Sequence, residues 1–184
     1  MAIVGEQWGL FPLLRDWVTA GRPVWCGIEL VTQHVSCLRG TCAGLILLSN
    51  TAVMQRVGGQ ALVGGLDIHV CRNYFGSQLY SCELDLNSKD STDKYGDLIP
   101  SRAVFIRAPA VLKVGEGVEV IASVRAKPHP SARKEVEEVM NTETEDYSVV
   151  VAVRQGNILG TAFHPELTND TRWHRCVREL NCTR

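Results

Sequence analysis

One cysteine of this chain has the neighbours that a nucleophile needs. Cys42 lies in the stretch Gly-Thr-Cys-Ala-Gly (residues 40–44), and the apolar run from Leu45 to Leu48 follows directly. Glycines on both sides and a helix-like segment after them predict a strand-to-helix elbow, a turn that exposes its central side chain at a helix N-terminus. A thiol in that position ionises more readily than a free one. The alternative interpretation is that Cys42 is a small buried hydrophobic residue.

The partners for such a thiol occur near the other end of the chain. A thiol attacks a carbonyl carbon as its thiolate, so it needs a base that takes the proton and later returns it. His164 and Glu166 flank a proline. Because the residue before a proline is extended, alternation puts both side chains on the same side, where Glu166 can orient the imidazole. The same pair is also compatible with a surface hydrogen bond at a strand end.

A histidine and a carboxylate can also bind a metal, which needs a third and a fourth ligand. Among the other histidines, His69, His129 and His174 lie at no recognisable ligand spacing. We therefore expect no metal at this site.

The elements that must position these residues follow from the apolar periodicity. Helical spacing predicts a helix over residues 9–20, with Gly21 at its end, and a second helix over 170–180. Alternating or continuous apolar runs predict strands over residues 22–25, 66–70, 79–86, 103–109, 118–124, 147–153 and 158–163. The last two strands are separated by a turn, which predicts a hairpin. Helices and strands alternate early and strands pair locally late, which favours an α/β sandwich around a largely parallel sheet with an antiparallel portion.

Composition predicts one ordinary globular domain over residues 1–184. The hydrophobic fraction is 45%, the charged fraction 21% and the net charge −1, so there is no basic footprint for nucleic acid or for an anionic membrane. No apolar run is long enough to cross a bilayer, and the N-terminus does not have the pattern of a secretory signal. Seven cysteines without framework spacing indicate a reducing, cytoplasmic setting. Residues 127–146 form an acidic segment, which we expect at the surface.

Four separated motifs carry a family resemblance. They are GTCAG with LILL after it, GGQALVGGLDIHVCRNYFGSQ (58–78), VFIRAPAV (104–111) and VAVRQGNILGTAFHPELTNDTRWH (151–174). In this order the sequence resembles the glutaminase subunits of pyridoxal 5'-phosphate synthase, which are class I-type glutamine amidotransferases. The match runs from about Gly9 to His174. It implies a three-layer α/β/α sandwich of the flavodoxin-like type.

The resemblance also implies an activity. A triad of Cys42, His164 and Glu166 would hydrolyse L-glutamine to glutamate and ammonia through a glutamyl thioester, without a cofactor. The resemblance places Arg72 and the pair Ile106–Arg107 at the glutamine site, where an arginine can hold the substrate carboxylate through paired hydrogen bonds. The backbone N–H of Ala43 would be one oxyanion donor. Ammonia would pass to a separate synthase subunit, which builds the pyridoxal phosphate (vitamin B6).

Two features depart from the family pattern. The family's first strand and helix, and a Gly-Gly-Glu-Ser motif that supplies a second oxyanion donor, have no counterpart here, so we expect an N-terminally truncated domain without that strand and helix. Residues 26–39 are an insert directly before the elbow. The insert can loop out, or residues 34–39 can occupy the slot of the strand that precedes the nucleophile.

These departures leave more than one function open. The first is an active glutaminase subunit, and the second is a catalytically impaired homologue that acts only as a synthase-binding module. A third is a redox or chaperone-like cysteine protein on a related elbow fold. The arginines and the His-Pro-Glu motif count against the third, because a redox cysteine needs neither.

Overall fold

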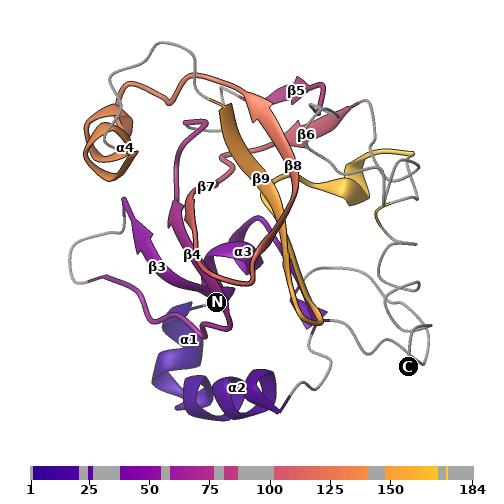
Figure 1. The fold of residues 1–184 in the computed structure, drawn as a ribbon. Helices are drawn as coiled ribbons and strands as arrows, with labels where there is room; N and C mark the ends of the chain where they lie inside the picture. Colours follow the sequence, from indigo (N-terminus) through magenta and orange to yellow (C-terminus); the bar gives the residue numbers. More distant parts are fainter. Residues whose placement is uncertain are drawn as a thin grey trace.

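A mixed β-sheet whose spatial order differs from its sequence order forms the centre of the molecule. The computed structural model describes residues 2–20, 25–26, 38–54, 59–76, 81–86, 102–140, 148–169 and 173. The sheet runs in the order β1-β2-β10-β9-β7-β4-β3, with β8 paired to β9 beside this path (Figure 1). Its strands are β1 (Trp25–Cys26), β2 (Leu38–Thr41), β3 (Ser49–Val53), β4 (Leu66–Cys71), β7 (Ala110–Val114), β8 (Glu119–Arg125), β9 (Ser148–Gln155) and β10 (Ile158–Thr161). Parallel pairs join β1 to β2, β2 to β10 and β3 to β4, and the other pairs are antiparallel.

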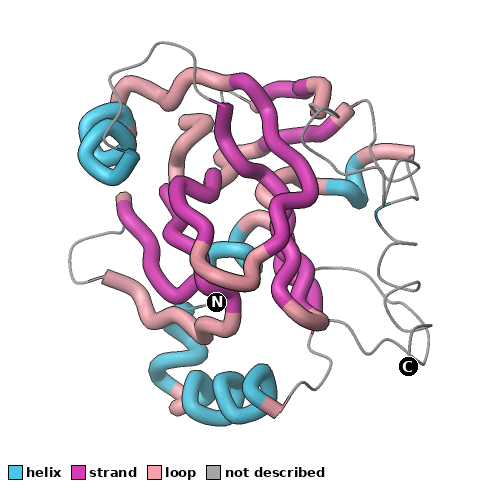
Figure 2. Tube along the Cα trace, in the orientation of Figure 1, coloured by secondary structure: helices cyan, strands magenta, loops and turns pink. Residues whose placement is uncertain are grey.

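The helices lie around this sheet. Helices α1 (Ala2–Gln7) and α2 (Leu10–Thr19) lie together at one end, α4 (Arg133–Met140) lies at the other, and α3 (Ala43–Leu48) contacts β2, β10 and β3 (Figure 2). A second sheet pairs β5 (Cys82–Leu84) with β6 (Ala103–Phe105), and the short 3-10 helix η4 (Pro165–Leu167) contacts β6. The predicted α/β class agrees with this arrangement. The expectation of a largely parallel sheet is wrong, because three of the described strand pairs in the main sheet are parallel and four are antiparallel.

Helix α2 forms where its periodicity predicts a helix, but only part of its apolar sequence is buried, because Leu10, Leu13 and Trp17 are exposed. Phe11 and Val18 are buried, and Val18 belongs to the central core. Two hydrogen bonds connect α1 and α2 to the segment before β4. Arg15 donates to the carbonyl of Leu62 at 2.8 Å, and Glu6 accepts from the backbone N–H of Ala61 at 3.0 Å. The predicted end of this helix, Gly21, lies outside the described residues.

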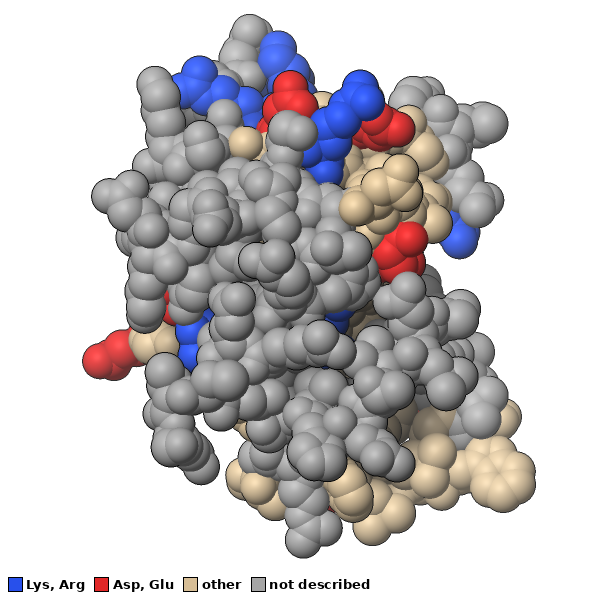
Figure 3. Space-filling view, turned by 90° about the vertical axis from the view of Figure 1, so that its right-hand side faces the viewer, with Lys and Arg blue, Asp and Glu red and all other residues tan. Residues whose placement is uncertain are grey.

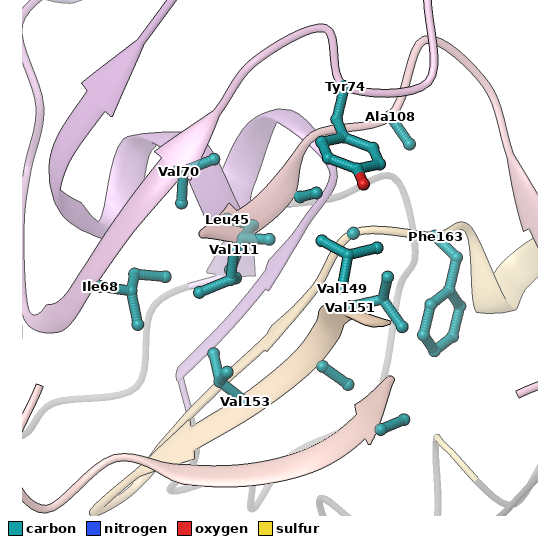
Figure 4. Packing of buried hydrophobic residues seen from close by; sticks show 14 of the residues in the cluster. Leu45, Ile68, Val70, Tyr74, Ala108, Val111, Val149, Val151, Val153 and Phe163 are labelled. Atoms are coloured by element: carbon teal, nitrogen blue, oxygen red, sulfur yellow. The ribbon is translucent and has the colours of Figure 1, made fainter. Parts of the chain in front are cut away.

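The core lies between the sheet and α3. Figure 4 shows Leu45 of α3 together with strand residues from β4, β7 and β9, and all of them are at most 3% exposed. The residues labelled there on these strands are Ile68, Val70, Val111, Val149, Val151 and Val153. Their β-branched side chains suit the pleated, buried surface of a sheet. The apolar run that the sequence placed after the elbow therefore packs directly on the central strands.

Several predicted elements are confirmed. Strand β4 covers the predicted residues 66–70, β8 covers most of 118–124, and β9 and β10 form the predicted antiparallel hairpin. Its turn includes Gly156 at φ 58°, a conformation that glycine adopts without strain. The acidic segment forms α4, whose exposed face carries the charges while Val136 is buried. In the predicted C-terminal helix only Trp173 is described.

The prediction of one strand over residues 103–109 is wrong. Strand β6 ends at Phe105, the chain bends at Ile106 and Arg107, and a separate strand, β7, begins at Ala110. Arg107 has φ 47°, a left-handed conformation that no extended strand contains. Pro109 therefore precedes a strand and does not end one.

The insert at residues 26–39 contributes strand at both of its ends. Cys26 belongs to β1, and Leu38 and Arg39 open β2, which pairs in parallel with β10. Of the two arrangements open from the sequence, the structure has the one in which the end of the insert occupies the strand slot before the nucleophile. Residues 27–37 lie outside the described part of the chain.

The described surface charges are mixed in sign. On the face drawn in Figure 3, the Lys and Arg side chains lie interspersed with Asp and Glu side chains, and the described residues form no broad patch of either sign there. Several are paired, as in Arg133 with Glu137 one helical turn later at 2.7 Å. Within the described residues, no helix combines the length and the apolar character that a membrane crossing requires.

Candidate active site

Cys42 forms the predicted elbow between β2 and α3. Its backbone has φ 51° and ψ −101°, close to the first central position of a type II′ turn, where glycine is the usual residue. Its N–H donates to the carbonyl of Thr161 at 2.8 Å, and its own carbonyl accepts from the N–H of Ile46 at 3.3 Å. A non-glycine residue in such a conformation costs about 1–3 kcal/mol and persists only where its surroundings hold it. The strand β10 and the first turn of α3 provide that hold.

Two glycines let the helix approach the strands beneath the elbow. A Cβ atom on Gly40 would lie 2.6 Å from Cδ1 of Leu48 and 2.7 Å from the carbonyl carbon and oxygen of Gly44. A Cβ atom on Gly160 would collide with Leu45. Gly40 and Gly160 are register partners in the β2–β10 pair. Neither of these adjacent strand positions has a side chain, so α3 packs closely on β2 and β10 just after the cysteine.

His164 and Glu166 form a hydrogen-bonded pair at the end of β10. The Nδ1 atom of His164 lies 2.7 Å from Oε1 of Glu166, and the backbone N–H of His164 donates to the carbonyl of Val104 at 2.9 Å. His164 has φ −104° and ψ 88°, which lies outside the α region, as expected before a proline, but short of the fully extended range. The carboxylate holds the proton on Nδ1, so Nε2 is the nitrogen left for the thiol.

Cys42 and Glu166 both act on the protonation of His164. Its pKa is raised to about 9, first by a hydrogen bond with Cys42 and then by the hydrogen bond with Glu166, while burial opposes the shift. Both partners stabilise the imidazolium form, which is the form that can give a proton to a leaving group. The structure thus brings together the three residues that the sequence placed in one triad.

The segment from Val104 to Ala108 connects several parts of this site. The carbonyl of Ile106 lies 4.0 Å from Sγ of Cys42, the carbonyl of Val104 holds His164, and the carbonyl of Ala108 accepts from the N–H of Phe75 at 3.4 Å. The exposed Arg107 takes its left-handed conformation in the middle of this segment. The bend therefore turns one carbonyl toward the thiol while its neighbours hold the flanking segments.

Arg72 follows β4 directly and its backbone N–H donates to the carbonyl of Val53 at 3.3 Å. Its Nε atom is buried and makes no hydrogen bond within the described part of the chain. A buried guanidinium N–H without an acceptor is costly, and a carboxylate ligand would supply that acceptor. The backbone hydrogen bond from Phe75 to Ala108 links the segment that carries Arg72 to the segment that carries Arg107.

Ala43 is the first residue of α3 and is exposed. The first N–H groups of a helix have no partner within it, so this N–H is open to an oxyanion formed at the thiol. Two backbone contributions could not be read from the sequence, namely the carbonyls of Thr161 and Val104. Neither is marked by residue type, because only strand pairing decides which carbonyl meets which N–H.

Among the described residues, no group of three or more His, Cys, Asp and Glu side chains is placed to hold a metal ion. His69 bonds Thr51 at 2.9 Å and His129 bonds Ser131 at 2.8 Å, so these two histidines have local partners on other elements.

Comparison with known proteins gives a consistent family. The profile of the SNO glutamine amidotransferase family matches residues 23–181. A probable pyridoxal 5'-phosphate synthase subunit PDX2 of Arabidopsis thaliana is 47% identical over 178 residues, covering 95% of this chain and 64% of that protein. A pyridoxal 5'-phosphate synthase subunit PdxT of Clavibacter michiganensis subsp. michiganensis is 38% identical over 177 residues, covering 96% of this chain and 65% of that protein.

A probable subunit pdx2 of Dictyostelium discoideum is 37% identical over 177 residues, covering 93% of this chain and 60% of that protein. The chain therefore spans somewhat less than two thirds of the length of these curated relatives. A solved structure described as a glutamine amidotransferase is similar with a TM-score of 0.64 and 33% identity, over 97% of this chain and 71% of that one. The sheet and helices described above are thus the α/β fold of a glutamine amidotransferase, and this chain belongs to the SNO glutamine amidotransferase family.

Proposed function

We propose that this chain is a glutaminase subunit that hydrolyses L-glutamine to glutamate and ammonia and delivers the ammonia to a synthase subunit for pyridoxal 5'-phosphate (vitamin B6) biosynthesis. The observation that carries the proposal is the hydrogen bond between Nδ1 of His164 and Oε1 of Glu166, at 2.7 Å, together with the position of Cys42 as the neighbour that most raises the pKa of His164. Family membership supports it, as do the names of the relatives, which are subunits of pyridoxal 5'-phosphate synthase.

The residues take the following roles in the proposed reaction. The Cys42 thiolate attacks the side-chain amide carbon of glutamine, and the negative charge on the amide oxygen is met by the N–H of Ala43. The His164 imidazolium gives its proton to the leaving nitrogen, so the C–N bond breaks and ammonia departs from a glutamyl thioester. Neutral His164, held by Glu166, then takes a proton from water, which attacks the thioester and releases glutamate with the thiolate restored.

Substrate binding is assigned to three residues around this centre. Arg72 supplies a guanidinium whose buried Nε has no partner within the described chain, which suits the α-carboxylate of glutamine. The bend at Ile106 and Arg107 places a carbonyl 4.0 Å from the thiol and fits the α-ammonium end or the amide of the substrate. No step of this reaction needs a cofactor or a metal ion.

The compartment is proposed to be the cytoplasm. Cys42, Cys71 and Cys82 are free thiols, of which Cys71 is buried and Cys42 and Cys82 are partly exposed. Thiols of this kind persist in a reducing environment. A nucleophilic Cys42 depends on that environment, since oxidation would consume the thiolate.

Glutamate release by the full purified chain, alone and with a synthase subunit of a relative, tests the proposal. Cys42→Ala removes the nucleophile, and Cys82→Ala is the matched control because it removes another partly exposed thiol, on β5, which is not one of the proposed triad residues. We expect release by the wild type and by Cys82→Ala in the presence of the synthase subunit, and none by Cys42→Ala. Release no greater than that of Cys42→Ala would contradict the active assignment.

The second candidate function is a synthase-binding module without turnover. The strained backbone of Cys42 favours the active assignment, because a module that only binds has no use for a non-glycine residue at φ 51°. Sedimentation of the chain with the synthase subunit separates the two. Binding without glutamate release would support the module, and release would exclude it.

A further inference from the structure

Five buried aromatic rings form a continuous series beneath the site. The centroid distances are 5.1 Å from Tyr74 to Phe75, 4.6 Å from Phe75 to Phe105, 5.8 Å from Phe105 to Phe163 and 5.0 Å from Phe163 to Trp173. All five side chains are at most 8% exposed, and Figure 4 shows the first and fourth of them, Tyr74 and Phe163, within the core. We call these residues the aromatic ladder.

Three rings of the ladder come from segments that carry the site residues. Phe75 lies three positions after Arg72, Phe105 directly precedes Ile106, and Phe163 directly precedes His164. Successive residues of an extended segment point to opposite sides, so a ring directed into the core leaves its neighbour directed away from it. Phe163 is 1% exposed while the side chain of His164 is 23% exposed, so the ring lies in the core and the imidazole at its edge. The rings are the inner faces of segments whose outer faces form the site.

Backbone hydrogen bonds accompany the ring contacts at both junctions. The Phe75–Phe105 contact lies beside the bond from the N–H of Phe75 to the carbonyl of Ala108, at 3.4 Å. The Phe105–Phe163 contact lies beside the bond from the N–H of His164 to the carbonyl of Val104, at 2.9 Å. Each junction is therefore fixed twice, once by the backbone and once by a pair of planar side chains.

We propose that Phe105 and Phe163 are positioning residues, and that the aromatic ladder sets the placement of His164 relative to Cys42 and to the segment that carries Arg72. Aromatic pairs prefer particular relative orientations, which an aliphatic side chain of similar hydrophobicity does not impose. Loss of one ring lets the two backbone segments slide, and a displacement of about 1 Å at a reacting group costs on the order of 100-fold in rate. The role of the Arg72 end rests on the proposed glutaminase function, whereas the link from Phe163 to His164 does not.

The test compares Phe163→Leu with Phe11→Leu in the full chain. Phe11 is buried in α2 and belongs to no ring pair of the described chain, so the control has the same chemistry at a distance from the site. The first readout is the titration of His164 by NMR, assigned among the five histidines by the signal lost in His164→Gln. We expect Phe163→Leu to lower the His164 pKa by at least about half a unit, because its hydrogen bond with Cys42 loosens, and Phe11→Leu to leave it unchanged.

Kinetics with the synthase subunit give the second readout. We expect Phe163→Leu to lower kcat at least about 10-fold with less than a twofold change in KM for glutamine, Phe75→Leu to raise KM, and Phe105→Leu, at the centre of the ladder, to change both. Phe163→Met retains most of the volume, so it replaces Phe163→Leu if that variant does not fold. If the rings had only a structural role, all variants including Phe11→Leu would lose stability, and kcat and KM would not change separately in the different ladder variants.

Two results decide the proposal separately from the glutaminase assignment. If Phe163→Leu and Phe11→Leu give the same His164 titration and the same kcat, the ladder has no positioning role. If the wild type releases no glutamate even with the synthase subunit, the glutaminase proposal fails, and the His164 titration still decides whether the ladder positions the imidazole.

Discussion

Replacing Gly40 by alanine tests whether the elbow depends on close contact between β2 and α3. The added Cβ would lie 2.7 Å from the carbonyl carbon and oxygen of Gly44, against the 3.4 Å at which ordinary contact begins, a shortfall of about 0.7 Å. Those atoms are helix backbone, so relief requires the first turn of α3 to retreat from the strand. Overpacking of this kind costs about 1–3 kcal/mol of unfolding free energy. The retreat also moves Cys42, which precedes that turn.

The assay has two parts, each with a matched control. Urea unfolding gives the stability, and the alkylation rate of the Cys42 peptide by iodoacetamide, followed by mass spectrometry, reports the position of the thiol. Gly117→Ala is the control, because Gly117 has φ 74° and open space around it, so alanine there costs about 1 kcal/mol through the backbone alone. We expect both variants to lose stability and only Gly40→Ala to change the alkylation rate, by about 10-fold or more.

A second substitution separates the backbone from the side-chain part of the clash. The added Cβ also meets Cδ1 of Leu48, at 2.6 Å, and Leu48→Ala removes that atom. If the backbone of Gly44 limits the approach, the double variant Gly40→Ala/Leu48→Ala recovers no Cys42 reactivity. Unchanged stability and alkylation in Gly40→Ala alone would refute the reasoning, since the helix would then not need the bare strand surface.

Three further predictions concern the site. His164 has a folded-state pKa of about 9, above its ordinary value, so it is protonated at neutral pH and loses its proton as the pH rises through about 9. Cys42 is the largest cause of this raised pKa. We therefore expect Cys42→Ala to lower the His164 pKa more than Glu166→Gln does, measured by NMR titration. Arg72→Ala raises KM for glutamine at least about 10-fold while Arg72→Lys, which keeps the charge but not the paired donors, recovers part of the loss; equal KM values in all three proteins would contradict the assignment. The hydroxyl of Tyr74 donates to the carbonyl of Ala126 at 2.7 Å, and Tyr74→Phe removes this donor. We expect the variant to lower the unfolding free energy by about 1–2 kcal/mol, measured by urea unfolding.

The parts of the site that follow local rules could be predicted from the sequence. A cysteine between glycines before an apolar run predicts an elbow, and a histidine before a proline predicts extended backbone next to a carboxylate two positions on. The backbone angles of Cys42 agree with the predicted elbow, while His164 avoids the α region as predicted but is not fully extended. The hairpin of β9 and β10 was predictable for the same reason, since its turn and its alternation are local.

The parts that depend on pairing or on unusual backbone could not be predicted. Strand β3 begins directly after α3, at Ser49, without a loop between the two elements. The left-handed bend at Arg107 has no sequence signal, because arginine has no preference for positive φ, and it divided one predicted strand into β6 and β7. The sequence left two arrangements for residues 26–39, and only pairing of Leu38 and Arg39 with β10 distinguishes them.

The backbone of Cys42 has a consequence for the choice of an inactive variant. At φ 51° and ψ −101° this position would be relaxed by glycine but not by alanine or serine. Cys42→Gly would therefore be more stable than Cys42→Ala. It would also remove the backbone strain at the elbow and allow this position other conformations. A ligand-trapping or crystallographic study needs the less stable of the two, Cys42→Ala, because it preserves the receptor shape that the intact thiol presents to its substrate.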